Sequence, residues 1–340
     1  MAEVTEQKYT YKDYSSDQEV RWCPGCGDYA ILSAMQRALP ELDVKKEEVV
    51  FISGIGCSSR FPYYMNTYGF HSIHGRAPSF ATGVKLANPD LHVWQITGDG
   101  DALSIGGNHF IHVLRRNIDI NILLFNNEIY GLTKGQYSPT SQVGLKTKST
   151  PHGSLDNPFS AGNLAMGANG TFFARMPDSD HKYMSKIFIE ASKHKGTSLI
   201  EILQNCPIFN DKVHAPITDK ENRAGSQLIL EHGKPVLFGE ENSKGIVLDG
   251  LKLKAVTIGE NGISEADILV HNAKEEDSTL HTMLIKMNLD KDLPVAMGII
   301  RAVESSTYDE LLHQQIKDVK STSKINSVDE LLHSGDTWEV

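Results

Sequence analysis

The chain has 340 residues, of which 40% are hydrophobic and 22% charged, and a formal net charge of −10. This length can bury one large core or two modest ones, and the acidic balance argues against a nucleic-acid partner, which needs a basic face. Residues 1–20 are polar, so we expect a flexible arm rather than a signal peptide, and no stretch approaches the roughly 20 apolar residues of a membrane span. We therefore expect a cytoplasmic protein with no membrane partner, in a compartment that keeps thiols reduced.

Helical and strand patterns alternate along the first 200 residues or so, and glycine-rich turns follow the predicted strands. This order is typical of an open, mostly parallel α/β sheet, in which ligands bind beyond the carboxyl ends of the strands. Residues 138–178 are rich in small and polar residues, so we expect a long, partly irregular excursion near the ligand. The predicted elements, in chain order, are helix 28–39, strand 49–53, helix 79–89, strand 91–97, helix 104–116, strand 120–126, helix 188–195 and strand 198–203.

The pattern changes after about residue 210. Short strands are expected at 234–238, 245–248 and 254–258, and apolar helical or strand signal occurs at 265–270, 278–287 and 296–304. The residues from about 306 onward are polar and predict a peripheral tail. The chain is therefore expected to comprise an arm (1–20), an α/β domain (21–210) and a C-terminal extension of strands and short helices ending in the tail (211–340).

A Gly-Asp-Gly turn and an Asn-Asn pair follow two strands of the predicted sheet. Asp99 comes at the end of one strand, and 25 residues separate Gly100 from Asn126 at the end of the next. The Asp99 carboxylate, an amide oxygen of Asn127 and the carbonyl of Ile129 are the kind of oxygen ligands that Mg²⁺ prefers. The glycines on either side of Asp99 let the backbone approach a phosphate closely, and the helix that follows favours an anion. A lone Gly-Asp-Gly is common at turns, but with the Asn pair it resembles the thiamine diphosphate motif.

The four cysteines of the chain form one close pair and two singletons. Cys23 and Cys26 flank a Pro-Gly turn, whereas Cys57 and Cys206 each follow a strand end. Four thiolates suit either tetrahedral zinc or a [4Fe–4S] cluster, and spacing alone does not decide between them. Buried free cysteines are a third interpretation. A structural zinc site more often pairs two close doublets, and an enzyme with thiamine diphosphate has a use for an electron carrier, which favours iron.

Six motifs occur in one order along the chain. They are WCPGCGD (22–28), GIGCSSR (54–60), HGRA (74–77), GDGD (98–101), NNEIYGLTKGQYSPT (126–140) and NCPIF (205–209). Together they resemble the beta subunit of 2-oxoacid:ferredoxin oxidoreductases, and most of all the 2-oxoglutarate type. The resemblance is dense over about residues 20–215 and less distinctive beyond, and it implies a thiamine diphosphate-binding α/β fold.

The resemblance implies a role for each motif residue. Cys23, Cys26, Cys57 and Cys206 would hold one [4Fe–4S] cluster, and Asp99, Asn127 and the Ile129 carbonyl would hold Mg²⁺. Ile55, Gly56, Cys57, Ser58 and His74 would lie against the thiamine, and Gly100, Asp101, Gly131 and Leu132 would line the diphosphate. Arg60, Arg76 and Lys134 are positive residues in or near the motifs that would reach an anionic substrate or the diphosphate. His74, Arg76 and Lys134 are the candidates for a catalytic role.

Four other polar residues near the motifs favour a structural interpretation. His109 and His112 are spaced like a metal pair, but apolar neighbours surround them, so packing or hydrogen bonding is the better explanation. The same reasoning makes His71 structural. Glu128, between two positions of the magnesium site, is expected to face away from it.

The resemblance also implies a reaction and partners. The reaction is oxidative decarboxylation of 2-oxoglutarate with coenzyme A to succinyl-CoA and CO2, with electrons passing through the cluster to ferredoxin. The residues after about 210 are too few for the second α/β domain that carries the activating glutamate of thiamine enzymes. A larger alpha subunit, or alpha and gamma subunits, would supply that glutamate and much of the coenzyme A site, so we expect this chain to be inactive alone.

Three alternatives remain at the level of sequence. The first is the same reaction on pyruvate or on a broad range of 2-oxoacids. The second is a non-redox thiamine diphosphate enzyme whose cysteines hold structural zinc. The third is a non-catalytic regulatory or assembly protein, against which the complete set of ligand positions argues.

Overall fold

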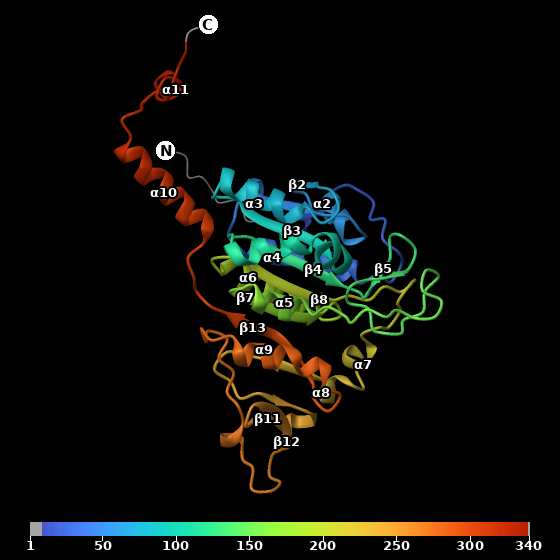
Figure 1. Ribbon diagram of the computed structural model, residues 1–340. Coiled ribbons are helices and arrows are strands. Elements are labelled where there is room, and N and C mark those ends of the chain that lie inside the picture. The colour runs from blue at the N-terminus through green and yellow to red at the C-terminus, as the bar shows by residue number, and fades with distance from the viewer. Residues whose placement is uncertain (1–8, 339–340) are drawn as a thin grey trace, which may run out of the picture.

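An eight-stranded sheet forms the centre of the molecule, in a computed structural model that describes residues 9–338 (Figure 1). The strand order is β2-β1-β3-β4-β8-β7-β13-β9, and neighbours run parallel except for the antiparallel pair β7 and β13. This is the open, mostly parallel α/β sheet that the sequence predicts. The strands of this sheet are β1 (Val49–Ser53), β2 (Tyr68–His71), β3 (His92–Gly98), β4 (Asn121–Asn126), β7 (Phe172–Pro177), β8 (Ser198–Leu203), β9 (Gln227–Leu230) and β13 (Val295–Ala302).

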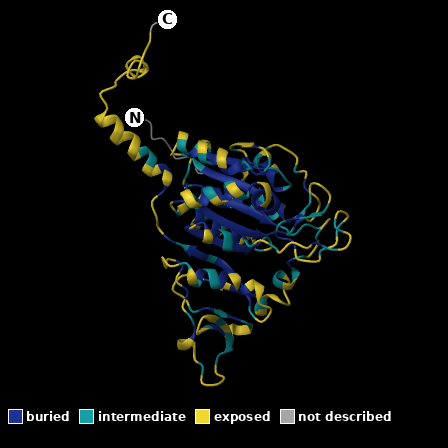
Figure 2. Cartoon of the chain, viewed as in Figure 1, coloured by how far each residue is buried: buried dark blue, intermediate teal, exposed yellow. Residues whose placement is uncertain are grey.

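Helices cover both faces of the sheet, and Figure 2 shows the buried strands between helices with exposed outer sides. Successive side chains of β1 enter different cores: Val50 and Ile52 pack with one set of helices, and Val49 and Phe51 with the other. This alternation follows from the period of two along a strand. One face packs against α3 (Ala77–Ala87), α4 (Gly107–Arg116), α5 (Ala161–Gly167) and α9 (Thr279–Lys286), and the other against α1 (Asp28–Ala38), α2 (Phe61–Tyr64) and α6 (His181–Lys193).

Most predicted elements of the first 210 residues are confirmed, including β1 and β8 at their predicted bounds. Helical structure begins earlier than expected before α4 and at α6, and by a smaller margin at α3. A π-helical turn over Asp101–Ile105 precedes α4, and such turns are frequent at functional sites. Helix α6 begins at His181 because the Asp180 side chain accepts a hydrogen bond from Tyr183 N at 3.0 Å and caps the first turn.

The expected irregular excursion is shorter than the sequence indicates. Residues 138–160 contain no helix or strand, but α5 and the buried strand β7 occupy the remainder of the range 138–178. Arg175 interrupts the apolar pattern of β7, and its Nε donates to Glu201 Oε2 on β8 at 2.7 Å. The partner of this charge comes from another strand, so the local sequence does not reveal a buried strand.

The main sheet continues past residue 210, where the sequence analysis placed the end of the α/β domain. Strands β9 and β13 extend it at one edge, whereas β10 (Leu237–Phe238), β11 (Lys244–Asp249) and β12 (Lys252–Thr257) form a separate antiparallel sheet. The expected element at 265–270 is only a 3-10 turn over Glu265–Asp267. The remaining short elements are the hairpin strands β5 (Ile129–Tyr130) and β6 (Gln136–Tyr137), α7 (Ala215–Thr218) and α8 (Arg223–Ser226).

The two ends of the described chain behave differently. Residues 9–20 pack on the body, because Tyr14 is fully buried and Ser16 N donates to the Tyr64 carbonyl at 3.2 Å, which corrects the expected arm for this part. The rest of that arm, residues 1–8, lies outside the described residues. At the other end, α10 (Tyr308–Thr322) and α11 (Val328–Leu332) lead away from the body (Figure 1). Within residues 9–338, no helix has the length and apolar character that crossing a bilayer requires.

Candidate active site at the strand ends

A cavity of about 100 Å³ lies at the carboxyl ends of β1, β3 and β4. The structure brings to it every residue that the sequence assigns to the thiamine, diphosphate and magnesium positions. Asp28 and Tyr130, which the sequence analysis did not single out, line it as well. The predicted residues in its wall are Ile55, Gly56, Cys57, Ser58, His74, Asp99, Gly100, Asp101, Asn127, Ile129, Gly131 and Leu132.

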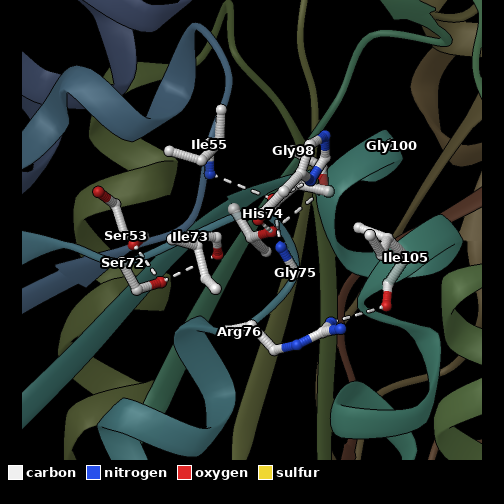
Figure 3. Close-up of polar contacts among 12 residues, drawn as sticks. Ser53, Ile55, Ser72, Ile73, His74, Gly75, Arg76, Gly98, Gly100 and Ile105 are labelled. Atoms are coloured by element: carbon white, nitrogen blue, oxygen red, sulfur yellow. Dashed lines mark hydrogen bonds and ion pairs between the residues drawn. The ribbon is translucent and has the colours of Figure 1, made fainter.

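The Asp101 carboxylate accepts hydrogen bonds from the loops that form the cavity. Its Oδ1 accepts hydrogen bonds from Ile55 N at 3.1 Å and Gly75 N at 2.8 Å, and its Oδ2 accepts one from Thr97 Oγ1 at 2.7 Å. Figure 3 shows Ile55 and Gly75 converging from separate loops. The buried carboxylate is therefore engaged by the protein itself. Its contacts identify Asp101 as the group that positions the loops around the predicted diphosphate.

Two glycines allow this close approach. A Cβ added to Gly54 would lie 1.8 Å from Asp101 Oδ2. A Cβ added to Gly75 would lie 2.4 Å from Gly106 N, and Gly75 has a φ of 69°, a conformation that side chains disfavour. Because Gly54 and Gly75 have no side chains, the loops after β1 and β2 can pack against the turn after β3.

His74 lies beside the same carboxylate. Its Nδ1 is 2.7 Å from Asp101 Oδ1, and its side chain is 41% exposed and lines the cavity. The two atoms do not have hydrogen-bond geometry, because His74 Nδ1 is buried without a hydrogen-bond partner. The contact places the imidazole in the wall of the cavity, which fits the predicted position next to the thiamine.

Asp99 is buried at the end of β3, with two hydroxyl groups against one of its oxygens. Ser138 Oγ lies 2.6 Å and Thr140 Oγ1 2.5 Å from Asp99 Oδ2, so neither of them uses Oδ1. Burial raises the pKa of this carboxyl, and the two hydroxyl groups oppose that rise. A bound cation would offset the cost of burying the charge, so the carboxylate fits the predicted Mg²⁺ ligand.

A buried polar network continues from Asp99 into the core. Thr140 Oγ1 is also 2.9 Å from Asn126 Oδ1, but its single proton serves the nearer carboxylate. Asn126 Nδ2 donates to Glu201 Oε1 at 2.9 Å, and the other oxygen of Glu201 pairs with Arg175. The network holds the first asparagine of the motif in the sheet, and the second, Asn127, reaches the cavity.

The four cysteines gather beside the cavity. The turn between Cys23 and Cys26 is closed by a hydrogen bond from Cys26 N to the Cys23 carbonyl at 3.0 Å, with Gly25 at a φ of 81°. A Cβ added to Gly131 would lie 3.6 Å from both Cys57 Sγ and Cys206 Sγ. Because Gly131 and Cys57 also line the cavity, the thiols and the cavity share a wall.

Burial and mutual proximity raise the pKa values of two of these thiols. The pKa of Cys57 rises to about 12, through burial first and then through Asp28, Cys206 and Cys23. The pKa of Cys26 rises for the same main reason, with Asp28 next in effect. Thiols in this environment keep their protons until a metal replaces them, because metal coordination deprotonates a thiol outright. The site therefore favours coordination over free thiolates.

The four thiols suit more than one kind of metal centre. Within residues 9–338, no group of three or more His, Cys, Asp or Glu side chains converges closely enough to hold one metal ion. Four thiolates can bind one tetrahedral zinc ion or be distributed over the four irons of a [4Fe–4S] cluster. The metal and sulfide content of the purified protein distinguishes these two centres.

The candidate catalytic residues other than His74 lie outside the cavity. Arg76 donates from Nη1 to the Ile105 carbonyl at 3.1 Å, which Figure 3 also shows. Lys134 is exposed in the hairpin between β5 and β6, with a φ of 80°. A second cavity, of about 420 Å³, shares Ile55, Gly56 and Leu132 with the first, and Arg60 lines it. Of the positive residues Arg60, Arg76 and Lys134, Arg60 lines the second cavity, and the other two line neither of these cavities.

Of the two histidines that are spaced like a metal pair, His109 has a hydrogen-bond partner, and His112 Nδ1 is buried without one. His109 Nδ1 is 2.9 Å from Ser79 Oγ, so this residue hydrogen-bonds between two helices, as expected. His71 contacts the ring of Tyr63, with centroids 5.9 Å apart, and lines the second cavity. Glu128 does not line the first cavity, and burial raises its pKa to about 7.

Sequence reasoning missed several residues of the site. Ser138 and Thr140 lie within a quoted motif, but their contact with Asp99 crosses from one loop to another. Tyr130 donates from its hydroxyl to the Gly100 carbonyl at 3.1 Å. Gln204 contacts both Asn127 and Cys26. The only signal in the sequence was nearness to a motif, which does not specify a partner.

Comparison with known proteins places the chain in a family. Residues 54–202 match the family described as thiamine pyrophosphate enzyme, C-terminal TPP binding domain. The chain is 51% identical to the 2-oxoglutarate oxidoreductase subunit KorB of Mycobacterium tuberculosis, over 99% of this chain and 90% of that protein. It is 47% identical to the 2-oxoacid:ferredoxin oxidoreductase subunit beta of Saccharolobus solfataricus, over 56% of this chain and 63% of that protein.

A solved structure agrees with the sequence relatives. The fold matches a chain of the 2-oxoglutarate:ferredoxin oxidoreductase from Magnetococcus marinus, determined with 2-oxoglutarate, coenzyme A and succinyl-CoA bound. The TM-score is 0.77 and the identity 28%, over 98% of both chains. With its motif residues gathered at one cavity and its identity to KorB extending over nearly the whole chain, the protein belongs to the family of 2-oxoglutarate and other 2-oxoacid:ferredoxin oxidoreductase beta subunits.

Proposed function

We propose that this enzyme subunit, with an alpha partner, catalyses thiamine diphosphate-dependent oxidative decarboxylation of 2-oxoglutarate with coenzyme A to succinyl-CoA and CO2. Electrons pass through a [4Fe–4S] cluster to ferredoxin. The observation that carries the proposal is the position of Cys57, which lines the cofactor cavity and lies with Cys206 against Gly131. A cluster held there is next to the cavity in which the reaction takes place.

The residues at the strand ends fit Mg²⁺ and a diphosphate. Asp99, Asn127 and the Ile129 carbonyl would hold the ion, and Gly100 and Gly131 line the cavity in which the diphosphate would lie. Bound thiamine diphosphate supplies the carbon nucleophile that attacks a 2-oxoacid. The protein's share is to orient the cofactor through the loops that Asp101 ties together and to present His74 to it.

The second cavity fits an acidic substrate. It opens next to the cofactor cavity at Ile55 and Leu132, and Arg60 brings positive charge to its wall, whereas Arg21 in the same wall is paired with Glu19 at 2.8 Å. A guanidinium group pairs with carboxylates in a bidentate manner. We assign the distal carboxylate of 2-oxoglutarate to Arg60, which separates this substrate from pyruvate.

The site needs a partner to be complete. Its cofactor cavity of about 100 Å³ is smaller than ordinary ligand pockets, which enclose about 300 to 1,000 Å³. An alpha subunit, or alpha and gamma subunits, would close over the cavity and contribute the activating glutamate and much of the coenzyme A site. Cys23 is exposed, so ferredoxin has a route to the cluster on that side. Clusters and reduced thiols fit a cytoplasmic location.

The test is an anaerobic assay of the chain purified with its alpha partner. We expect viologen reduction that requires 2-oxoglutarate, coenzyme A, Mg²⁺ and thiamine diphosphate, and that is slower with pyruvate. The isolated chain should be inactive, and Asp99→Asn in the complex should abolish most of the rate, because it removes the charged ligand of the ion. Equal rates for the isolated chain and the complex, or no reduction with any 2-oxoacid, would refute the proposal.

A further inference from the structure

One buried amide side chain lies between the two predicted cofactor positions. Gln204, directly after β8, is 1% exposed. Its Oε1 accepts a hydrogen bond from Asn127 Nδ2 at 2.8 Å. Its Nε2 donates to Cys26 Sγ at 3.3 Å and to the Asn205 carbonyl at 2.6 Å. A single side chain therefore contacts a proposed magnesium ligand and a proposed cluster ligand.

Two backbone groups determine which way both amides face. An N–H group only donates and a carbonyl only accepts. Ile129 N donates to Asn127 Oδ1 at 3.2 Å, so the NH2 group of Asn127 must face Gln204. At the other end the Asn205 carbonyl needs a donor, so Gln204 must turn its NH2 group toward Asn205 and Cys26. The orientations of the Asn127 and Gln204 amides therefore follow from the two backbone groups that they contact.

The surrounding backbone keeps Gln204 in this position. Gln204 N donates to the Asn126 carbonyl at 2.9 Å, which anchors the residue to the end of β4. A Cβ added to Gly27 would lie 1.9 Å from Asp178 Oδ2 and 3.0 Å from Gln204 Cγ. The glycine directly after Cys26 thus leaves space for the side chains of Asp178 and Gln204, which pack against this turn.

We propose that Gln204 is a positioning residue that couples the two cofactor sites, by orienting Asn127 toward Mg²⁺ and by stabilising the Cys26 thiolate on the cluster. This inference rests on the proposed function. Partners that orient a metal ligand typically affect metal affinity or activity by about 10- to 100-fold. Hydrogen bonds to cluster sulfurs are among the factors that set cluster reduction potentials. An N–H donor stabilises the more negative reduced cluster, so losing it lowers the potential.

Two substitutions of Gln204 separate its two contacts. Gln204→Met keeps the length of the side chain and removes both hydrogen bonds. Gln204→Glu keeps an oxygen acceptor toward Asn127 and removes the amide donor at Cys26. Gln227→Met is the matched control, because Gln227 is a buried glutamine of the same sheet that donates to the Ile217 carbonyl at 2.8 Å.

The measurements use the anaerobic holo-complex with its alpha partner. Redox titration followed by electron paramagnetic resonance gives the cluster potential, and calorimetric titration of the metal-depleted complex in the presence of thiamine diphosphate gives the Mg²⁺ affinity. We expect Gln204→Met to lower the potential and to weaken Mg²⁺ binding by about 10- to 100-fold. Gln204→Glu should lower the potential with Mg²⁺ affinity like that of the parent, and Gln227→Met should change neither.

The outcomes distinguish this inference from the proposed function. A parent complex without iron and sulfide would overturn both. A parent with its cluster, together with parent-like potential and Mg²⁺ affinity in Gln204→Met, would overturn the coupling alone. If Gln204→Met does not retain its cluster, Gln204→Glu carries the test, and a parent-like potential in that variant overturns the role of Gln204 at Cys26.

Discussion

Asp99 and Asp101 stand two positions apart and have different tasks. The Asp101 carboxylate is taken up by Ile55, Gly75 and Thr97 of the protein. The Asp99 carboxylate has hydroxyl groups on Oδ2 only, which leaves Oδ1 for an ion. Both carboxylates are buried. Their hydrogen-bond partners, rather than their exposure, therefore distinguish Asp101, which has a structural role, from Asp99, the proposed Mg²⁺ ligand.

The hydroxyl group of Thr140 should matter for metal binding. Thr140→Val keeps the shape and removes the donor 2.5 Å from Asp99 Oδ2, so we expect Mg²⁺ affinity to fall by about 10- to 100-fold. Calorimetric titration of Mg²⁺ into the thiamine diphosphate-loaded complex measures this. Thr282→Val, which removes a hydroxyl bonded to the Ser278 carbonyl on α9, is the control. Unchanged affinity in Thr140→Val would show that Asp99 needs no such support.

The sequence predicts residues of this site when they follow strands. Asp99 and Asn127 could be predicted together, because parallel strands bring their carboxyl ends to one edge of a sheet. Thr140 could not, because it lies in an irregular loop, and Gln204, although it follows β8, could not be linked to Cys26, because Cys26 follows no strand. The contact between Gln204 and Cys26 spans 178 positions, and no local pattern specifies it.

At the scale of the elements, the loops after β1 and β2 are held in place by hydrogen bonds to the turn after β3. The loop after β2 reaches that turn only where Gly75 meets Gly106, which brings His74 to the carboxylate of Asp101. Of the elements around this contact, β1, β3 and α3 were predicted from their apolar residues, but β2 was not, because all four of its residues are exposed. Strand β7 was missed because Arg175 interrupts its pattern and finds its partner, Glu201, on another strand.

A side chain at Gly75 should disrupt the site. Gly75→Ala adds a Cβ at 2.4 Å from Gly106 N at a φ of 69°, so we expect a loss of roughly 1–3 kcal/mol in the free energy of unfolding and weaker thiamine diphosphate binding. Gly83→Ala in α3 is the control, because nothing lies within 4 Å of the added atom. That variant should gain about 0.5–1 kcal/mol. Urea unfolding and cofactor titration measure both effects, and equal behaviour of the two variants would contradict this explanation.

At the scale of the whole molecule, β13 joins the region after residue 210 to the sheet that carries the site. It pairs with β7 on one side and with β9 on the other. His271 Nε2 donates to the Ile299 carbonyl on this strand at 2.9 Å, and His271 Nδ1 is buried without a partner. Strands β9 and β13 of the C-terminal region are thus an integral part of the main sheet, whereas α10 and α11 lead away from it.

A lower pH should reduce the free energy of unfolding through His271, which bonds to β13. Burial lowers the pKa of His271 from 6.5 to about 4, so between these values the unfolded chain binds a proton that the folded chain does not. Stability therefore falls as the pH falls through this window, by about 2 kcal/mol at pH 5. His271→Gln keeps a donor for Ile299 and cannot titrate.

Urea unfolding at pH 7 and pH 5 measures the effect. The loss of stability between the two values should be smaller in His271→Gln than in the parent. His333→Gln, a change at the exposed histidine directly after α11, should leave the loss unchanged. An equal loss in His271→Gln and the parent would show that His271 does not carry it.

The central claim is that the four cysteines hold an electron carrier beside the cofactor cavity. The most direct measurement is iron, acid-labile sulfide and zinc per chain, on protein purified without oxygen together with its partner. We predict about four irons and four sulfides with negligible zinc. About one zinc with no sulfide would contradict the claim and leave a thiamine diphosphate enzyme with a structural metal.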